Sequence, residues 1–586
     1  MSGTVFTRFF ILLSLVVLVP AIASTKGAVS DFAMPLSNPW ESPNTGRARY
    51  IVQSTTSRIA RDDVNRVGGS TRRSLEIIHA VEAELTTRQV AKIRRLGDVT
   101  VYQDRRIAPS GKPAPPTTAL TDGEVVNAQP DQYITDYPML VGATILQRMG
   151  ITGKGVTIAV LDTGIWTGGA QNFVPRILAS LDVVGGAAQP VTSDPYGHGT
   201  HITSIAAGGA ITPLGSWFGI APNANLVIVR AFDGEGMGSY TNVIAGLNWI
   251  VANRQKYNIR VLNLSFGAPP ESYYWNDPLN QAVMAAWQAG IVVVASAGNS
   301  GPTPMTIGVP GNIPYVITVG AMTDNFTPFI PTDDRLASFS STGPTYEGFV
   351  KPEMVAPGGH MVGSMWYQSY LANIDRNSMR KNESLFVMSG TSQAAAVTSG
   401  VVALMLQANP TLTPDAVKCH LIASASPALA SNGTPAYSVF QQGAGLINAP
   451  NAVNSTVSKC ANQGLNIAAD LAGTQHFGGP ANRDSNGNYY VMNLSSPVWG
   501  TPLSGAGYSW TQAYEATQGY TWTQGYTWTQ GYTWTQGETW TQGETWTQGY
   551  TWSQGYTWSN SLPWNSTTAA GATSSSTSIE DWVPNE

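Results

Sequence analysis

The sequence predicts an α/β protein in its central part, and two kinds of local pattern support that fold class. Apolar runs at 155–161, 261–267 and 293–297 have the length and composition of buried strands. Each run ends in small or polar residues, where a strand would stop. Stretches rich in alanine and valine at 200–207 and 393–405 have the composition of helices instead.

Three polar residues with catalytic potential stand at the ends of these elements. Asp162 ends the first apolar run, His198 opens one helical stretch between two glycines, and Ser392 opens the other. A serine hydroxyl becomes a nucleophile when a histidine takes its proton and a carboxylate orients that histidine. Taken singly, the three motifs are also typical of a turn, a loop histidine and a helix N-cap. Together, in the order Asp, His, Ser, they indicate a serine-protease triad.

The segments 160–164, 197–201 and 389–393 resemble the subtilisin-like serine proteases, the subtilases (peptidase S8 type), and the resemblance extends over residues 47 to 455. It implies a doubly wound, mostly parallel sheet in a catalytic domain at 137–460. It also implies a serine endopeptidase (EC 3.4.21 type) that works through an acyl-enzyme. A small α+β prodomain would precede this domain, and a repetitive low-complexity tail would follow it.

Further site residues follow from the same resemblance. Asn299 comes after the third apolar run, and the matching family residue donates its amide to the oxyanion; a turn asparagine is the alternative. His201 is expected to be a packed or hydrogen-bonded histidine. The substrate contacts implied are Gly236, Met237, Gly238, Ser265, Gly267, Ala297, Gly298 and Gly308. None of them is charged, so we expect a broad or apolar preference before the cut, although plain turns would also explain the glycines.

The chain departs from the family pattern in two places. Gln393 and Ala396 stand where the family usually has methionine and proline, and neither change removes a catalytic group. A buried glutamine needs hydrogen-bond partners. Between Gly358 and Gly390 the chain is longer than a small subtilisin and contains Trp366, Tyr367, Tyr370, Arg376, Arg380 and Lys381. We expect a surface insertion near the cleft.

The N-terminus predicts secretion. Residues 1–23 contain Arg8, an apolar run at 9–19 and a small-residue cleavage site at 21–23, which is the pattern of a signal peptide. The run is short for a membrane span, and an uncleaved anchor is the alternative. We therefore expect a secreted, extracellular protein without a membrane span, with association at the cell surface left open.

Residues 24–107 resemble the inhibitory propeptide of subtilases (inhibitor I9 type), which would make this segment an inhibitory partner of its own enzyme. Residues 47–52, 74–85 and 99–102 are predicted as strand, helix and strand, with a second helix starting after a cap at Thr86 or Thr87. Residues 47–106 carry thirteen Lys and Arg against seven Asp and Glu, a net charge of +6. The whole chain has a net charge of −5, so the remaining residues carry −11. A basic prodomain thus complements an acidic enzyme. The alternative is a basic module that binds nucleic acid, but acidic residues alternate along the predicted helix and interrupt any basic stripe.

Residues 108–136 are rich in proline, threonine and alanine, which is typical of a cleavable linker. We expect self-processing between Arg106 and Tyr137.

The two cysteines, Cys419 and Cys460, favour a disulfide in an oxidising compartment, with two free thiols as the alternative. No residues have metal-ligand spacing, so we expect no metal site and no required cofactor. Structural calcium is an expectation from the family resemblance alone, and the sequence marks no loop for it.

The C-terminal part divides into a Gly/Asn-rich connector at 461–507, hexapeptide repeats at 508–559 and a Ser/Thr-rich tail at 560–586. The repeat, clearest in Tyr-Thr-Trp-Thr-Gln-Gly at 520–525, has an even period and would place its aromatic residues on one face of a strand. Such a face could bind polysaccharide, a cell surface or neighbouring chains. A disordered tail is the alternative.

Two other functions stay open at this point. One is a surface adhesin whose repeats act on a catalytically dead scaffold, which the presence of all four chemical residues argues against. The other is a protease restricted to a few partner proteins, which the insertion near the cleft would favour.

Overall fold

The structure is a computed structural model that describes residues 46–109 and 136–503, with gaps at 170, 185–189, 192, 213–214, 326, 328–332, 381–383, 459 and 495–500. Four short backbone segments between 520 and 551 are also described. The predicted signal peptide, nearly all of the predicted linker, most of the repeats and the predicted tail lie outside these residues.

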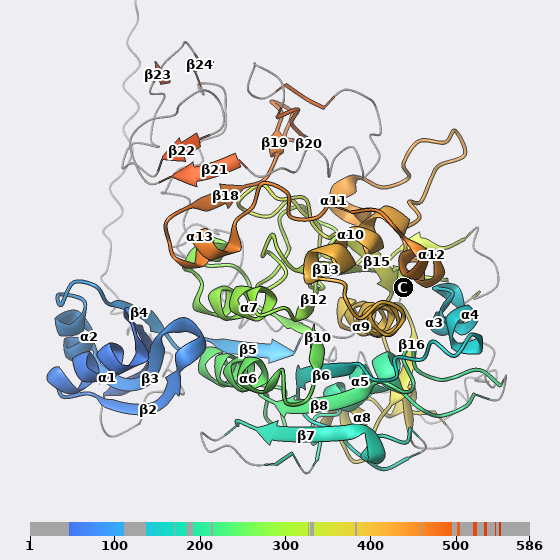
Figure 1. Ribbon diagram of the computed structural model, residues 1–586, viewed down its shortest axis with the longest axis horizontal. Helices are drawn as coiled ribbons and strands as arrows, with labels where there is room; N and C mark the ends of the chain where they lie inside the picture. Colours follow the sequence, from blue (N-terminus) through green and yellow to red (C-terminus); the bar gives the residue numbers. More distant parts are fainter. Residues whose placement is uncertain are drawn as a thin grey trace, which may run out of the picture.

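A mostly parallel sheet forms the centre of the molecule (Figure 1). Its strand order is β14-β13-β12-β10-β6-β8-β7, and β15 also pairs with β13. The chain moves from β6 to β8 and β7 on one side and to β10, β12 and β13 on the other; β14 alone is antiparallel to its neighbour. The predicted α/β class with a parallel sheet is thus confirmed. The strands are β6 (Thr157–Asp162), β7 (Ile177–Asp182), β8 (Asn225–Arg230), β10 (Ile259–Leu264), β12 (Val292–Ser296), β13 (Ile317–Thr323), β14 (Arg335–Leu336) and β15 (Met354–Pro357).

Helices cover this sheet in two packed pairs, α5 with α9 and α6 with α7. The main helices are α5 (His198–Ala207), α6 (Tyr240–Asn253), α7 (Pro278–Gln288), α9 (Thr391–Ala408) and α10 (Pro414–Ser424). Shorter ones are α3 (Tyr137–Leu140), α4 (Ala143–Arg148), α8 (Tyr370–Ile374), α11 (Val439–Gln442) and α12 (Ala449–Asn454). No helix of the described residues is long and apolar enough to cross a membrane.

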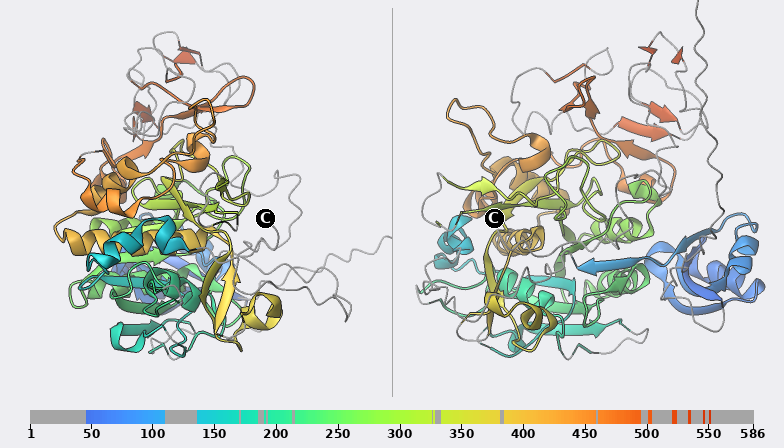
Figure 2. Two further views of the ribbon diagram at one scale, coloured as in Figure 1. Left: turned by 90° about the vertical axis from the view of Figure 1, so that its right-hand side faces the viewer. Right: turned by 180° about the vertical axis from the view of Figure 1, so that it is seen from behind.

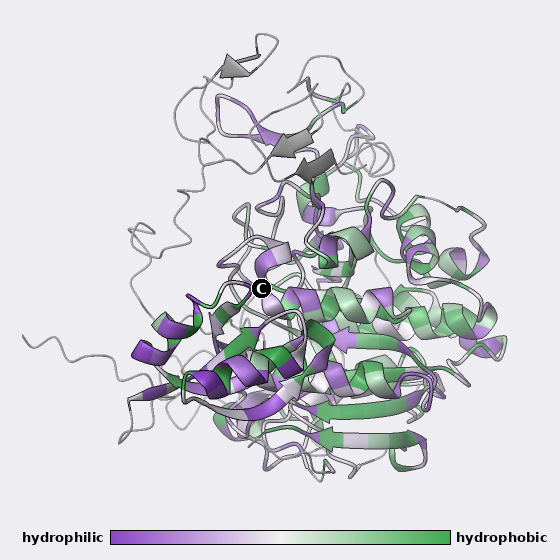
Figure 3. Cartoon of the chain, turned by 60° about the vertical axis from the view of Figure 1, so that its left-hand side comes forward, coloured by the Kyte–Doolittle hydropathy of each residue, from purple (hydrophilic) through white to green (hydrophobic). Residues whose placement is uncertain are grey.

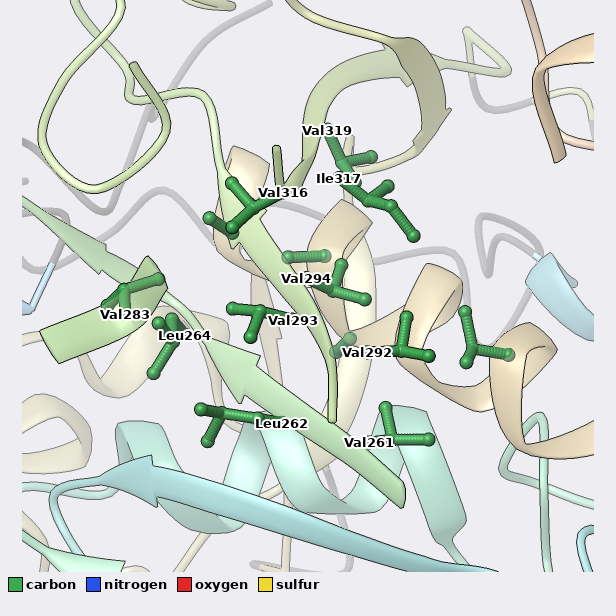
Figure 4. Packing of buried hydrophobic residues seen from close by; sticks show 14 of the residues in the cluster. Val261, Leu262, Leu264, Val283, Val292, Val293, Val294, Val316, Ile317 and Val319 are labelled. Atoms are coloured by element: carbon green, nitrogen blue, oxygen red, sulfur yellow. The ribbon is translucent and has the colours of Figure 1, made fainter. Parts of the chain in front are cut away.

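The core lies between the sheet and these helices. Figure 3 shows that strands of the sheet are hydrophobic over most of their length. Figure 4 shows aliphatic side chains of β10, β12 and β13 interdigitating, among them Val261, Val293 and Ile317, all 0% exposed. Strands that are buried on both faces have continuous apolar sequences, and this is why the sequence predicts them.

A separate small domain precedes the parallel sheet. Its antiparallel sheet has the order β2-β3-β1-β4, and its own core includes Val64, Val81, Leu85 and Ile93. The elements are β1 (Arg47–Gln53), α1 (Ser57–Arg66), β2 (Ser70–Leu75), β3 (Ala80–Thr86), α2 (Thr87–Ile93) and β4 (Thr100–Gln103). Thr86 caps α2 in a capping box, as predicted.

The predicted helix at 74–85 is wrong, because these residues contain the end of β2, a 3₁₀ turn at Glu76–Ile78 and most of β3. β3 pairs with β1 on one side and β2 on the other. Glu82 is 1% exposed and accepts a hydrogen bond from Arg73 (Nε to Oε2, 2.6 Å). Two-sided pairing and a buried ion pair outweigh the helix propensity of this segment.

The described residues of 461–503 pack onto the domain that contains the parallel sheet. They form α13 (Ile467–Leu471), β18 (His476–Gly478), β19 (Ala481–Arg483) and β20 (Tyr489–Val491), and Phe477 and Val491 belong to the main core. Cys419 and Cys460 form a disulfide just before this segment.

Among the repeats only backbone is described, in β21 (Tyr520–Thr523), β22 (Thr533–Thr535), β23 (Thr545–Trp546) and β24 (Tyr550–Thr551). β21 pairs with β18 and, in parallel, with β22. The aromatic face and its ligand stay predictions.

Candidate active site

A buried carboxylate and a buried imidazole meet at the carboxyl end of β6. Asp162 Oδ1 lies 2.8 Å from His198 Nδ1, and the residues are 1% and 0% exposed. A carboxylate only accepts, so Nδ1 carries the proton and Nε2 is the basic nitrogen. The turn after Asp162 and the turn that starts with His198 approach each other closely because residue 199 is glycine. A Cβ on Gly199 would lie 2.4 Å from Gly164 O.

A second buried carboxylate, Asp194, joins the turn after Asp162 to the turn that starts with His198, and it was not among the site residues predicted from the sequence. Its Oδ1 accepts hydrogen bonds from the Thr163 hydroxyl and the Gly197 N–H, both at 2.8 Å. Its Oδ2 accepts from the N–H (2.8 Å) and hydroxyl (2.6 Å) of Thr200. Asp194 thus fixes the residues that flank Asp162 and His198. The available signal was Asp194 followed by Pro195 and Gly197, a pattern typical of a type I β-turn.

Ser392 lies in the first turn of α9, near the positive end of the helix dipole. Its hydroxyl donates to Ser265 O (3.2 Å), and the Ser265 hydroxyl donates to Ser392 O (2.9 Å). Asn263 Nδ2 donates to Ser265 Oγ (2.8 Å). These bonds hold the nucleophile candidate against the segment that joins β10 to β11 (Phe266–Gly267).

The side chain of Asn299 is anchored beside the same helix end. Its Oδ1 accepts hydrogen bonds from the N–H and the hydroxyl of Thr391, both at 2.9 Å. Because a backbone N–H must donate, this bond identifies which end of the amide is oxygen. The donor end, Nδ2, therefore points away from Thr391, the residue that precedes Ser392.

His201 belongs to the packing of α5 and not to the reacting groups. It is 0% exposed, and burial, with a smaller effect from nearby His198, lowers its pKa to about 3. Its Nε2 lies 3.1 Å from Phe386 O, and Gln393 Nε2 lies 3.4 Å from its Nδ1. His201 is thus neutral and hydrogen-bonded, as expected. Gln393 Oε1 is buried without a hydrogen-bond partner among the described residues.

The predicted substrate segments enclose a strand from the small domain. β5 (Arg106–Pro109) lies between β9 (Gly238–Ser239) and β11 in a three-stranded antiparallel sheet. Ile107 faces Gly238 across one ladder, and Ala108 faces Gly267 across the other. Both Figure 1 and the right-hand view of Figure 2 show β5 extending from the small domain into the catalytic domain.

The remaining predicted contact residues lie on two neighbouring loops. Gly236 and Met237 precede β9 in a turn, where the Met237 N–H donates to Asp233 Oδ1 (2.9 Å). Gly308 N donates to Ala297 O (3.2 Å), and Gly298 N donates to the Thr391 hydroxyl (3.1 Å). The last two bonds connect residues 297, 298 and 308 with the start of α9.

In the described ranges, no three His, Cys, Asp or Glu side chains come close enough to hold a metal ion. Structural calcium therefore has no assigned residues here.

Comparisons with known proteins agree with this geometry. Residues 153–445 match the profile of the Subtilase family (Peptidase_S8). Serine protease AprX of Bacillus subtilis (strain 168) is 40% identical over 315 residues, which cover 52% of this chain and 67% of that protein. Subtilisin DY of Bacillus licheniformis is 32% identical over 315 residues, or 53% of this chain and 94% of that protein.

Among solved structures, fervidolysin from Fervidobacterium pennivorans, described as a keratinolytic enzyme related to subtilisin, is similar in fold. The TM-score is 0.54 with 21% sequence identity, and the match covers 76% of this chain and 65% of that chain.

Proposed function

The chain belongs to the subtilase family of serine endopeptidases, and on that premise we propose that it is a secreted enzyme that removes its own prodomain. It has a broad or apolar preference for the residue before the cut. The observation that carries the maturation step is β5, which lies between β9 and β11 where the family resemblance places a substrate strand.

The proposed chemistry assigns one role to each anchored side chain. Ser392 attacks the peptide carbonyl while His198 takes its proton through Nε2, and Asp162 holds the imidazole by the bond to Nδ1. Asn299 Nδ2 and the Ser392 N–H donate to the developing oxyanion. His198 then protonates the leaving amine, and water releases the acyl-enzyme.

The register of β5 supports a specific cleavage position. Pro109, the last described residue of β5, faces Phe266 in an antiparallel pair, and Phe266 directly follows Ser265 in the chain. The Ser392 hydroxyl donates to the carbonyl of that same Ser265. We therefore propose that the bond cut during maturation follows Ser110.

Contacts of the small domain support its role as an inhibitor that stays bound after cleavage. Arg73 donates to Val183 O (3.1 Å) and to Asn242 Oδ1 (2.7 Å). Arg105 approaches Glu271 (3.1 Å) and Asp277 (3.5 Å) of the catalytic domain. The two Arg105 ion pairs match the opposite net charges of the two parts.

Two observations support the specificity and the location. The proposed contact residues at 236–238, 265, 267, 297, 298 and 308 are uncharged, so they favour an apolar side chain before the cut. A disulfide in the catalytic domain is typical of proteins made in an oxidising compartment, which fits the predicted signal peptide.

The test is secretion of the full chain beside Ser392→Ala, followed by N-terminal sequencing and a casein assay. The proposal expects a wild-type product that starts at residue 111 and cleaves casein, and a variant that keeps its prodomain and does not cleave. Equal behaviour of the two chains, both inactive on casein and on varied peptides, would exclude the protease function. An active enzyme with another N-terminus would exclude only the proposed cleavage site.

A further inference from the structure

The segment between Gly358 and Gly390 forms a small unit of its own beside the candidate active site. β16 (Met361–Ser364) and β17 (Leu385–Met388) pair as an antiparallel hairpin, and α8 lies in the loop between them. The unit has a hydrophobic cluster separate from the main core, made of Tyr196, Met365, Leu371, Ala372, Phe386 and Met388.

This unit is fixed to the turn that carries His198. The Tyr370 N–H donates to Pro195 O (2.8 Å), and the Leu371 N–H donates to Tyr196 O (3.1 Å). A Cβ on Gly197, the residue before His198, would lie 2.1 Å from Met365 Sδ. The unit therefore stands at a defined place next to the catalytic histidine candidate.

The unit exposes three large apolar side chains. Tyr367, Tyr370 and Ile374 are 40%, 42% and 38% exposed. Positions 370 and 374 are four residues apart, so they share one face of α8. Tyr370 also stacks on the buried Tyr196, with ring centroids 5.6 Å apart and planes at 17°. Single exposed apolar residues are ordinary, but a group of three beside a catalytic site indicates a binding surface.

This aromatic surface is continuous with the cleft that β5 occupies. Tyr196 lies under Tyr370 and also touches the loop before β9, because a Cβ on Gly236 would lie 2.6 Å from Tyr196 Cζ. β5 runs toward Ser392 and has its last described residue, Pro109, opposite Phe266. In Figure 1 and in the right-hand view of Figure 2, β5 points toward the part of the domain that contains β16 and α8. A substrate that continues past the nucleophile leads to this surface.

We propose that Tyr367, Tyr370 and Ile374 bind apolar or aromatic residues on the leaving-group side of a polypeptide substrate. The proposal rests on the protease function proposed above. It gives the enzyme a second selectivity, for residues after the cut, in addition to the broad or apolar preference before it.

The test compares two kinds of substrate with the same residues before the cut. One is a set of quenched peptides with phenylalanine or glycine at the first three positions after the cut, and the other is a p-nitroanilide, which has no residue there. The proposal expects wild type to prefer the phenylalanine peptides over the glycine peptides. Tyr370→Ala and Tyr367→Ala should each lower kcat/KM for the phenylalanine peptides relative to the p-nitroanilide by about tenfold.

Two control variants separate binding from folding. Tyr370→Phe keeps the stacked ring and should keep the preference. Ile145→Ala removes an equally apolar side chain, 55% exposed on α4, and should not change the ratio. A loss that is equal on the p-nitroanilide and on the peptides, or no loss in either tyrosine variant, would overturn the proposal. A wild type inactive on every substrate would overturn the protease function itself.

Discussion

Thr200 donates two hydrogen bonds to Asp194 beneath the candidate active site, from its N–H at 2.8 Å and from its hydroxyl at 2.6 Å. Both residues are 0% exposed. The other carboxylate oxygen binds Thr163 and Gly197, so one side chain joins the turn after Asp162 to the turn that starts with His198. The distance between Asp162 and His198, the acid and the base of the candidate triad, therefore depends on a residue outside that triad.

Asp194→Ala should destabilise the protein and lower its activity. It leaves four buried donors without an acceptor, and each such donor costs about 1–3 kcal/mol. We expect a loss of roughly 3 kcal/mol or more in the free energy of unfolding, measured in a Ser392→Ala background to prevent self-digestion. Asp182→Ala removes a partly buried carboxylate that pairs with Arg230 and accepts one N–H, from Val184, so it should cost less, about 1–2 kcal/mol. Equal effects of the two substitutions would contradict the role of Asp194.

Asn299→Ala and Asn299→Asp should both lower kcat. Either change removes the Nδ2 donor, and loss of one oxyanion donor typically costs about 10²–10³-fold in kcat. Aspartate keeps an oxygen for the Thr391 N–H and hydroxyl, so Asn299→Asp should retain the thermal midpoint better than Asn299→Ala. Steady-state kinetics on a p-nitroanilide and thermal unfolding measure both effects. A KM effect with unchanged kcat would assign Asn299 to substrate binding instead.

The elements that carry the candidate triad could be predicted because their information is local. Strands buried on both faces appear as apolar runs, and Asp162, His198 and Ser392 stand directly at element ends. The role of Asp194 depends on contacts with Thr163, which lies 31 residues earlier. A sequence pattern predicts a turn at Asp194, but it does not predict that Thr163 is the hydrogen-bond partner of this side chain.

Segments whose composition suits two structures could not be assigned in this way. Residues 74–85 have helix-forming residues, yet β1 and β2 pair with β3 on both sides and take its residues into a sheet. Residues 461–503 are rich in glycine and asparagine, yet apolar side chains among the described ones, such as Phe477 and Val491, reach the main core. In both cases contacts between distant segments decide the structure.

Glu347 should make the folded protein less stable as the pH rises from about 5 to about 7. Burial raises the pKa of this carboxyl to about 7, although the Tyr274 N–H donates to it (2.8 Å), and Oε2 is buried with no hydrogen-bond partner among the described residues. A folded pKa above the unfolded one stabilises the protein below the unfolded pKa, and this stability is lost as the pH rises through the folded pKa.

Glu347→Gln should remove this dependence while keeping an acceptor for Tyr274. In the Ser392→Ala background, the free energy of unfolding relative to the Gln variant should fall by roughly 2–3 kcal/mol between pH 5 and pH 8. Glu271→Gln changes an exposed carboxyl and serves as the control. A difference between the Glu347 forms that is the same at both pH values would contradict the prediction.

Asp104→Ala should release the cleaved prodomain faster. Asp104 is 8% exposed and accepts hydrogen bonds from the N–H (3.0 Å) and the hydroxyl (2.9 Å) of Thr241, in the first turn of α6. A carboxylate at a helix N-terminus contributes about 1 kcal/mol through its hydrogen bonds and the helix dipole. Loss of this contact should weaken prodomain binding by several-fold to about tenfold, since 1.4 kcal/mol corresponds to tenfold in affinity.

The measurement is the lag between processing and casein cleavage in the secreted full-length protein. The lag should shorten in Asp104→Ala, because in the proposed maturation the bound prodomain blocks the cleft through β5 until it dissociates. Asp98→Ala changes an exposed aspartate of the same domain, six residues earlier, and should leave the lag unchanged. N-terminal sequencing of each product must show normal processing for the comparison to hold. An unchanged lag in Asp104→Ala would mean that Arg73 and Arg105 hold the prodomain without help from the contact between Asp104 and Thr241.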